Sequence, residues 1–221
     1  MVRSRSSPIR NITDRQQTLV IMCKSPVAGI VKTRLARDIG ISHATRLYRS
    51  VLFNVVRRLQ ADRRYRVLVA VAPLQGLREN WWPRDLPDVT CIPQGPGNLG
   101  DKMQRVFDLD FVGPVLIIGT DIPEITRQRI SDAFRVLRSH DVVLGPADDG
   151  GYWCVGLRRS PRIPSIFDNV RWSSPETFAD TIKNVQHLRV GLCPPLADID
   201  SIEDYHKLKS TAARVIVSSG T

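Results

Sequence analysis

Three basic side chains follow the first apolar segment of the chain at a spacing that suits phosphate binding. The segment KSPVAGIVKTRL contains Lys24, Lys32 and Arg34 together with Gly29. Lysine supplies a point charge, arginine supplies a planar fork of donors, and glycine lets the backbone approach a ligand closely. We therefore expect this segment to hold phosphate groups, with a solvated basic loop as the alternative. The P-loop and G-x-G-x-x-G patterns are absent, so neither of those nucleotide sites is expected.

Carboxylates occur where a divalent metal ion could be held. Asp121 ends an apolar run in IIGTDIPEI, and Asp198 and Asp200 are two residues apart in LADIDS. Mg²⁺ and Mn²⁺ prefer carboxylate oxygens, and Mg²⁺ leaves coordination positions for phosphate. If LADIDS is extended, its two acidic side chains point the same way. The alternative for Asp121 is a cap on the following helix. The helix expected near Ser201 has its own S-x-x-D capping pattern, which leaves Asp198 and Asp200 without a structural role.

Two glycine-rich segments could line a bound ligand. QGPGNLG, from Gln94 to Gly100, is a polar loop that could wrap a base or a sugar. GPADDGGYW places Asp149 before Gly150 and Gly151 in a turn between two expected strands. Glycines in such a turn permit positive φ and close ligand approach. The alternatives are a plain loop and a tight hairpin.

Continuous apolar runs alternate with helical periodicities along the chain. Strands are expected at 18–23, 67–72, 89–94, 114–121 and 187–192, with a strand, turn and strand over 141–157. Helices are expected at 43–60, 99–110, 124–139 and 174–186. Strands buried on both faces have continuous apolar sequences, so we expect an α/β fold with a mainly parallel sheet between helices. Ligands bind beyond the carboxyl ends of such strands, where Lys24, Gln94, Asp121, Asp148 and Asp149 fall.

The chain has 221 residues, of which 42% are apolar, and we expect a single domain over residues 18–208. Residues 1–17 hold four arginines and one aspartate and lack an apolar segment. They are expected to be a disordered basic tail rather than a secretory signal. Residues 209–221 are expected to be a loose C-terminal end. No run approaches the roughly 18 apolar residues that span a bilayer, so no membrane span is expected.

Lysine and arginine outnumber aspartate and glutamate by 32 to 22, which gives a net charge of +10. This charge makes nucleic acid, an anionic surface and phosphorylated small molecules candidate partners. Few aromatic residues and no recognisable binding motif argue against nucleic acid. Cys23, Cys91, Cys154 and Cys193 are far apart and lack metal-site spacing, so we expect free thiols and a cytoplasmic protein.

Five motifs, taken in order, resemble the bacterial family called radical-SAM/selenodomain-associated transferases, which is grouped with the nucleotide-diphospho-sugar transferases. The patterns K-x-P-x-x-G-x-x-K-T-R-L and Q-G-x-G-x-L-G-x-[RK]-M match residues 24–35 and 94–103. The patterns I-G-[TS]-D-x-P, G-P-A-x-D-G-G-Y and D-[VI]-D-[ST]-x-E-D match residues 118–123, 145–152 and 198–204, and a W-[ST] element lies at 172–173. The resemblance spans about residues 18–208, with mild departures at Cys23, Ile30 and Ser174.

The resemblance implies a GT-A-like fold, a Rossmann-like three-layer α/β/α architecture. Phospholactate guanylyltransferases and molybdenum-cofactor nucleotidyltransferases look like relatives. It further implies that Asp121, Asp198 and Asp200 hold Mg²⁺ or Mn²⁺. The expected nucleotide-binding residues are Lys24, Gly29, Lys32, Arg34, Gln94, Gly97 and Gly100. The resemblance also implies that Asp149, Gly150 and Gly151 line an acceptor pocket.

The combined expectation is a metal-dependent transferase. It would take an NDP-sugar for glycosyl transfer, or a nucleoside triphosphate for nucleotidyl transfer, to a small phosphorylated or carboxylate acceptor. Asp121, through its metal, would act with Lys32 and Arg34 to stabilise charge on phosphate oxygens in the transition state. Residues 73–88 and 158–175 are expected to shape the pocket walls. The alternative is a non-catalytic protein of the same fold that binds nucleic acid or a partner.

Overall fold

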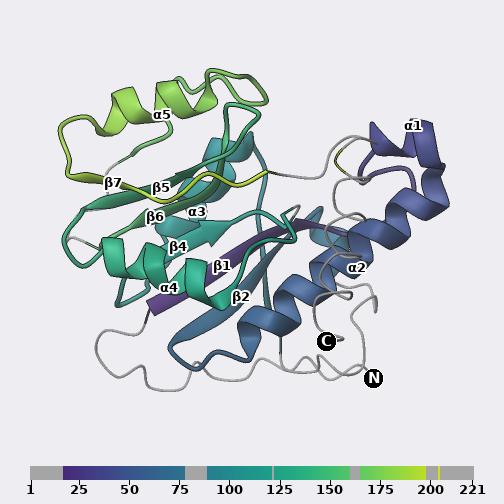
Figure 1. The fold of residues 1–221 in the computed structure, drawn as a ribbon, viewed down its shortest axis with the longest axis horizontal. Coiled ribbons are helices and arrows are strands. Elements are labelled where there is room, and N and C mark those ends of the chain that lie inside the picture. Colours follow the sequence, from purple (N-terminus) through teal and green to yellow (C-terminus); the bar gives the residue numbers. More distant parts are fainter. Residues whose placement is uncertain (1–16, 78–88, 121, 160–164, 198–203, 205–221) are drawn as a thin grey trace, which may run out of the picture.

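Strands and helices alternate along the chain, as the sequence predicts (Figure 1). The structure is a computed structural model that describes residues 17–77, 89–120, 122–159, 165–197 and 204. Its strands are β1 (Gln17–Lys24), β2 (Tyr65–Ala72), β3 (Thr90–Pro93), β4 (Val115–Ile118), β5 (Val142–Pro146), β6 (Tyr152–Leu157) and β7 (Val190–Leu192). Its helices are α1 (Leu35–Ile39), α2 (Ile41–Gln60), α3 (Leu99–Phe107), α4 (Arg127–Val136) and α5 (Thr177–Val185), with a 3₁₀ turn at Leu74–Leu77.

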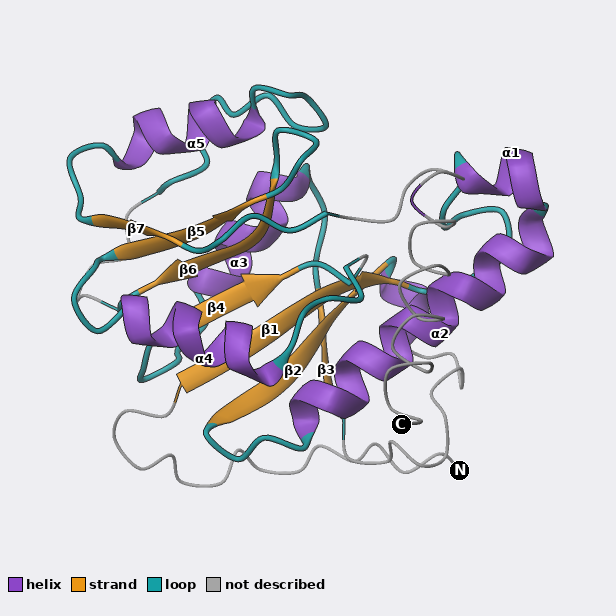
Figure 2. Ribbon diagram, viewed as in Figure 1, coloured by secondary structure: helices purple, strands orange, loops and turns teal. Residues whose placement is uncertain are grey.

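Within the described residues, the strands form one seven-stranded sheet in the order β3-β2-β1-β4-β6-β5-β7 (Figure 2). Neighbouring strands are parallel except at β6, which is antiparallel to both β4 and β5. The expectation of a mainly parallel sheet is therefore confirmed. The carboxyl ends of β1, β2, β3 and β4 share one edge of the sheet, where the sequence predicts the ligand-binding residues.

Helices cover both faces of the sheet, so the three-layer architecture is also confirmed. Alternate residues of β1 point to opposite faces, as a strand requires. Leu19 and Ile21 pack with side chains of α2 and α4, whereas Val20 and Met22 pack with α3 and α5. Both faces of β1 are fully covered, which explains why its sequence is apolar without interruption.

The ends of several elements differ from the predictions for local reasons. The helix expected over 124–139 begins at Arg127, because the Thr126 side chain accepts a hydrogen bond from the Arg129 backbone N–H at 3.2 Å. A capping role for Asp121 on this helix is therefore wrong. Gln17, which the sequence analysis places in the N-terminal tail, is the first residue of β1 and pairs with Tyr65.

None of the four cysteines, all of which lie in the described residues, forms a disulfide bond. Cys23, Cys154 and Cys193 are buried, and Cys91 is partly exposed. No helix in the described part of the chain is long and apolar enough to cross a bilayer.

Candidate functional site

A pocket of about 380 Å³ lies at the carboxyl ends of β1, β3 and β4, and we call it the basic pocket. Lys24, Lys32 and Arg34 all line it, so the structure brings together the three cations that the sequence singles out. Gln94 lines the same pocket from the end of β3. No acidic side chain of the described residues lines it. The basic pocket therefore presents a positive, partly apolar surface suited to an anion.

The end of β1 is held by a tyrosine that helical periodicity assigns only to the core. The Tyr48 hydroxyl donates to the Lys24 carbonyl at 2.9 Å and accepts from the Lys24 N–H at 2.9 Å. This pairing fixes the backbone of Lys24 while its side chain stays exposed. Tyr48 also lines the basic pocket, although it is only 5% exposed. It is a positioning residue that the sequence analysis missed, because the i, i+3, i+4 pattern of α2 explains it as packing.

Gln94 joins two strand ends rather than presenting its amide nitrogen to the pocket. Its Nε2 donates to the carbonyls of Cys23 at 2.9 Å and Ala70 at 2.8 Å. The side chain is buried, and both amide hydrogens are used. Only its Oε1 can therefore serve a ligand, and only as an acceptor. A nucleobase that contacts this residue would have to offer an N–H group.

The loop between β1 and α1 presents Lys32 and Arg34 to the basic pocket. Lys32 lies in the left-handed region with φ of 49°. Arg34 precedes the first residue of α1 and is exposed. Within the described residues, the Arg34 guanidinium forms no ion pair. Its donors are therefore available for an anion.

A second pocket of about 410 Å³ adjoins the first, and we call it the aromatic pocket. Tyr152, Trp153 and Trp172 line it, and burial raises the pKa of Tyr152 above its ordinary value. Polar groups converge on it from two segments: Asp149 and Gly151 from the turn before β6, and Ser173, Ser174 and Thr177 from the start of α5. Aromatic faces beside hydroxyl groups and one carboxylate suit a small polar molecule that carries hydroxyl groups.

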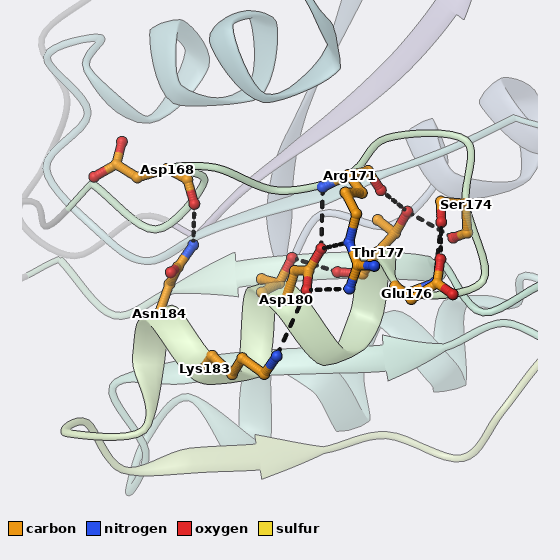
Figure 3. Close-up of polar contacts among 9 residues, drawn as sticks. Asp168, Arg171, Ser174, Glu176, Thr177, Asp180, Lys183 and Asn184 are labelled. Atoms are coloured by element: carbon orange, nitrogen blue, oxygen red, sulfur yellow. Dashed lines mark hydrogen bonds and ion pairs between the residues drawn. The ribbon is translucent and has the colours of Figure 1, made fainter.

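The wall formed by residues 171–177 is held by a polar network on α5 (Figure 3). Arg171 donates to both carboxylate oxygens of Asp180, from Nε at 2.8 Å and from Nη2 at 2.9 Å. This fork holds the pKa of Asp180 well below its usual range. The Thr177 hydroxyl donates to the Arg171 carbonyl at 2.6 Å and also to the Ser174 carbonyl at 2.8 Å. Both ends of the segment that carries Trp172 and Ser173 are therefore fixed.

Three further hydrogen bonds hold residues that line the aromatic pocket. The Ser174 hydroxyl donates to Glu176, and this hydrogen bond lowers the pKa of the Glu176 carboxyl. Trp153 donates from Nε1 to the Pro194 carbonyl at 3.0 Å. Asp149 accepts from the Gly151 backbone N–H at 2.9 Å, so its carboxylate is held at the mouth of the turn.

The predicted glycines do not share one role. Gly29 (φ 80°) and Gly97 (φ 97°) adopt conformations that favour glycine, and neither lines the basic pocket or the aromatic pocket. An added Cβ at Gly100 would lie 2.6 Å from Cζ2 of Trp172, so the lack of a side chain at Gly100 leaves room for the tryptophan ring. An added Cβ at Gly150 (φ 84°) would overlap the backbone of Pro175. Gly100 and Gly150 therefore act through packing against the 171–177 wall.

The three predicted metal ligands, Asp121, Asp198 and Asp200, lie outside the described residues. Thr120 lines the basic pocket and Ile122 lines the aromatic pocket, so the sequence neighbours of Asp121 face both. Leu196, two residues before Asp198 in sequence, lies beside the turn before β6, because its backbone N–H donates to the Pro146 carbonyl at 3.1 Å. Within the described part of the chain, no group of three His, Cys, Asp or Glu side chains could hold a metal ion.

Comparison with known proteins identifies relatives of the chain. A sequence model of the bacterial family described as "Uncharacterized protein conserved in bacteria (DUF2064)" matches residues 55–174. Among solved structures, the chain is similar to a "putative nucleotide-diphospho-sugar transferase" from Desulfovibrio desulfuricans G20. The TM-score is 0.76, with 27% identity over 88% of this chain and 86% of that one. A search of curated proteins gives no match.

Two more distant structures share the fold. One is a CMP:2-keto-3-deoxy-manno-octonic acid synthetase solved with CTP, with a TM-score of 0.58 and 11% identity over 90% of this chain and 99% of that one. The other is a Mycobacterium tuberculosis H37Rv protein solved with manganese, with a TM-score of 0.50 and 14% identity over 87% of this chain and 97% of that one. These similarities confirm the expectation of a GT-A-like fold.

Proposed function

This chain belongs to the bacterial DUF2064 family, and from its two adjoining pockets we propose that it is a metal-dependent transferase acting on an activated nucleotide. The nucleotide would bind in the basic pocket and the acceptor in the aromatic pocket. The similarity to the Desulfovibrio protein named as a nucleotide-diphospho-sugar transferase supports this class. The fold shared with a synthetase solved with CTP supports a nucleotide as the donor.

One observation carries the proposal: the two pockets share part of their lining. Lys24, Leu99 and Gly119 line both. Group transfer requires that the reacting atoms of two ligands come within about 3–3.5 Å of each other. Adjoining pockets at the carboxyl edge of a mainly parallel sheet suit this requirement, because that edge is where such folds bind their ligands.

The basic pocket has the chemistry to hold a diphosphate or triphosphate chain. Lys24 and Lys32 would supply point charges, and Arg34 would contact two phosphate oxygens with its fork. Negative charge on the leaving phosphate grows as its bond to the transferred group breaks. Cations already in place stabilise that charge without reorganisation, so these residues would lower the barrier as well as bind the donor.

A divalent metal would be held by Asp121 together with Asp198 and Asp200. Carboxylate oxygens are suitable ligands for Mg²⁺ and Mn²⁺, and the fold neighbour solved with manganese supports this choice. When bound, the metal would neutralise charge on the phosphate oxygens. Asp121 lies in sequence between Thr120 and Ile122, which line different pockets, and this supports a ligand at the boundary.

The reaction would take one of two forms at this boundary. In nucleotidyl transfer, an acceptor oxygen bonds to the α-phosphorus of a nucleoside triphosphate, and pyrophosphate leaves. In glycosyl transfer, the acceptor bonds to the anomeric carbon, and the nucleoside diphosphate leaves. A hydroxyl acceptor would give its proton to Asp149, the carboxylate that lines the aromatic pocket, whereas an anionic acceptor would need no base. Four cysteines without a disulfide bond among them support placing this reaction in the cytoplasm.

The proposal is tested by nucleotide binding to the Asp121→Asn variant, measured by calorimetry with Mg²⁺ and with EDTA. Wild-type protein should bind its nucleotide more tightly with Mg²⁺, and the variant should lose that difference. Asp132→Asn is the matched control, because Asp132 is an exposed partner of Arg135 on α4. A variant that still binds more tightly with Mg²⁺ than without it would remove Asp121 from the metal site.

The net charge of +10 favours one other candidate, a nucleic-acid-binding protein without catalysis. Binding of that kind weakens steeply as the salt concentration rises, because counterions are released from the phosphate backbone. A mononucleotide that binds with Mg²⁺ at high salt, where RNA no longer binds, would support the transferase. The reverse pattern would support the alternative.

A further inference from the structure

A third pocket, of about 730 Å³, lies at the opposite edge of the sheet from the proposed active site. Gln17 at the start of β1 lines it, as do Pro114 just before β4 and Arg158 just after the antiparallel β6. The basic pocket is instead lined by the far ends of the same strands, such as Lys24 of β1 and Thr120 after β4. The third pocket is therefore separate from both pockets described above.

Three arginines and an apolar floor line this third pocket, which we call the arginine pocket. Arg138 comes from the end of α4, and Arg158 and Arg159 follow β6. Val112, which is exposed, supplies apolar surface beside the buried Phe134 and Leu137. The cations thus come from two segments that are distant in sequence and line one cavity, where Arg138 and Arg158 are exposed and Arg159 is half-buried.

Among the described residues, two of these arginines lack the acidic partners that several other arginines have. Arg64, Arg135, Arg171 and Arg189 each form an ion pair with an aspartate. Neither Arg138 nor Arg158 forms one within the described residues.

The third arginine and the nearest acid do not neutralise the cavity. Arg159 donates to the Leu109 carbonyl at 2.6 Å, which fixes its guanidinium without cancelling its charge. Arg158 lies near Asp141, but Arg189 already forks onto that carboxylate at 2.9 and 3.1 Å and lowers its pKa to about 2. The arginine pocket therefore keeps its positive charge.

We propose that the arginine pocket binds a small phosphate-bearing molecule with an apolar or aromatic part. Guanidinium groups that converge on one cavity repel each other, and a bound phosphate relieves that repulsion while accepting forked hydrogen bonds. The apolar floor would cover the rest of the ligand. A volume of about 730 Å³ lies in the ordinary range of small-molecule pockets. This proposal does not depend on the reaction proposed above.

Gln17 lines the pocket, and the sixteen residues before it in sequence include four arginines and one aspartate. Their net charge therefore has the same sign as that of the arginine pocket. A small ligand is favoured over a nucleic acid strand, because strand binding uses an extended groove with stacking aromatic residues, and Phe134 is only 1% exposed.

The test is calorimetric binding of phenyl phosphate, with EDTA present, to a Lys32→Gln/Arg34→Gln variant that disables the basic pocket. Phenyl phosphate should still bind to this variant. Adding Arg138→Gln and Arg158→Gln should weaken binding at least tenfold, the loss expected when charge-assisted hydrogen bonds are removed. Arg135→Gln is the matched control on the same helix, since Arg135 pairs with Asp132 and does not line the pocket. It should change the affinity by less than about twofold.

Three results would overturn the proposal. One is the loss of phenyl phosphate binding in the Lys32→Gln/Arg34→Gln variant alone, which would assign all binding to the basic pocket. Another is unchanged affinity after Arg138→Gln and Arg158→Gln, in variants with the melting temperature of their parent. The third is that phenyl phosphate does not bind at concentrations below about 10 mM, whereas a short single-stranded RNA binds and loses affinity when Arg138→Gln and Arg158→Gln are added.

Discussion

The two halves of the proposed active site hold their polar side chains in opposite ways. In the basic pocket, Lys24 and Arg34 form no ion pair within the described residues. In the aromatic pocket, the wall at 171–177 is tied to α5 by the fork between Arg171 and Asp180 and by the two hydrogen bonds of Thr177. The described residues of the basic pocket include no neutralising acid, whereas the wall of the aromatic pocket is tied by its own hydrogen bonds.

This difference indicates how each half would contribute to function. A phosphate chain would complete the basic pocket, since it supplies the negative charge that the described residues there lack. The aromatic pocket is already formed, so its shape can select among acceptors without paying an ordering cost. Affinity should therefore depend mainly on the first half and acceptor choice on the second.

The largest expected effect comes from removing charge in the basic pocket. The Lys32→Gln/Arg34→Gln variant should bind nucleotide at least about a hundredfold more weakly, because each charge-assisted hydrogen bond contributes about 1.5–3 kcal/mol. Calorimetry with the best-binding nucleotide measures this loss. Arg37→Gln, an exposed change in α1 that leaves the pocket lining intact, is the control. If Arg37→Gln weakened nucleotide binding as much as Lys32→Gln/Arg34→Gln, the loss would come from the overall charge of the protein and not from contacts in the pocket.

A pair of glycine variants compares packing in the two halves. Gly29→Ala should cost about 1–2 kcal/mol of unfolding free energy, since φ is positive but no atom lies within 4 Å of the added Cβ. Gly150→Ala should cost about 3 kcal/mol or more, because its Cβ also overlaps the Pro175 backbone. Urea unfolding measures both. Equal costs would contradict the tighter packing inferred for the acceptor half.

Breaking the ion pair between Arg171 and Asp180 should impair the acceptor half of the site and leave the nucleotide half unchanged. Asp180→Asn replaces a carboxylate that accepts three hydrogen bonds from Arg171, so the melting temperature should fall by a few degrees. Nucleotide affinity should stay within about twofold of wild type, since Asp180 does not line the basic pocket. Acceptor KM should rise. A matching loss of nucleotide affinity would show that the halves are not independent.

The smallest expected effect is the change in unfolding free energy as the pH is lowered. The folded-state pKa of Asp141 is about 2, against about 3.9 in the unfolded chain, because Arg189 forks onto it. Its stabilisation is therefore fully present above pH 4 and is lost as the pH falls through 2. Because the Arg189 side chain is well exposed and the Asp141 side chain is partly exposed, the loss should be small. The unfolding free-energy difference between wild type and Asp141→Asn should shrink between pH 4 and pH 2, and a constant difference would contradict the pairing.

Much of the fold and part of the site follow from local patterns in the sequence. The uninterrupted apolar run that became β1 predicts a strand covered on both faces, and this is confirmed. The placement of Lys24, Lys32, Arg34 and Gln94 around one pocket follows because parallel strands end at the same edge. The start of α2 shows the limit, because the helix predicted from residue 43 begins at Ile41, directly after Gly40.

The remaining features depend on contacts between residues far apart in sequence, which periodicity does not encode. Gly100 looks like a ligand-approach glycine, but it lies against Trp172, seventy-two residues later. Gln94 looks like a base contact, but its amide joins two strand ends. The arginine pocket joins residues around 113, 138 and 158 that no motif connects. The W-[ST] element at Trp172 and Ser173 was a signal for the aromatic wall, since both residues line that pocket.

The central claim is most directly tested by the thermal stability of the wild-type protein with nucleoside triphosphates, nucleoside diphosphates and NDP-sugars, each with Mg²⁺, Mn²⁺ or EDTA. A ligand at a hundred times its dissociation constant adds about 2.7 kcal/mol of stability. We predict a clear, metal-dependent rise in melting temperature with one nucleotide class; a triphosphate would indicate nucleotidyl transfer and an NDP-sugar glycosyl transfer. No rise with any of them, in a well-folded protein, would contradict the claim that this cleft binds an activated nucleotide.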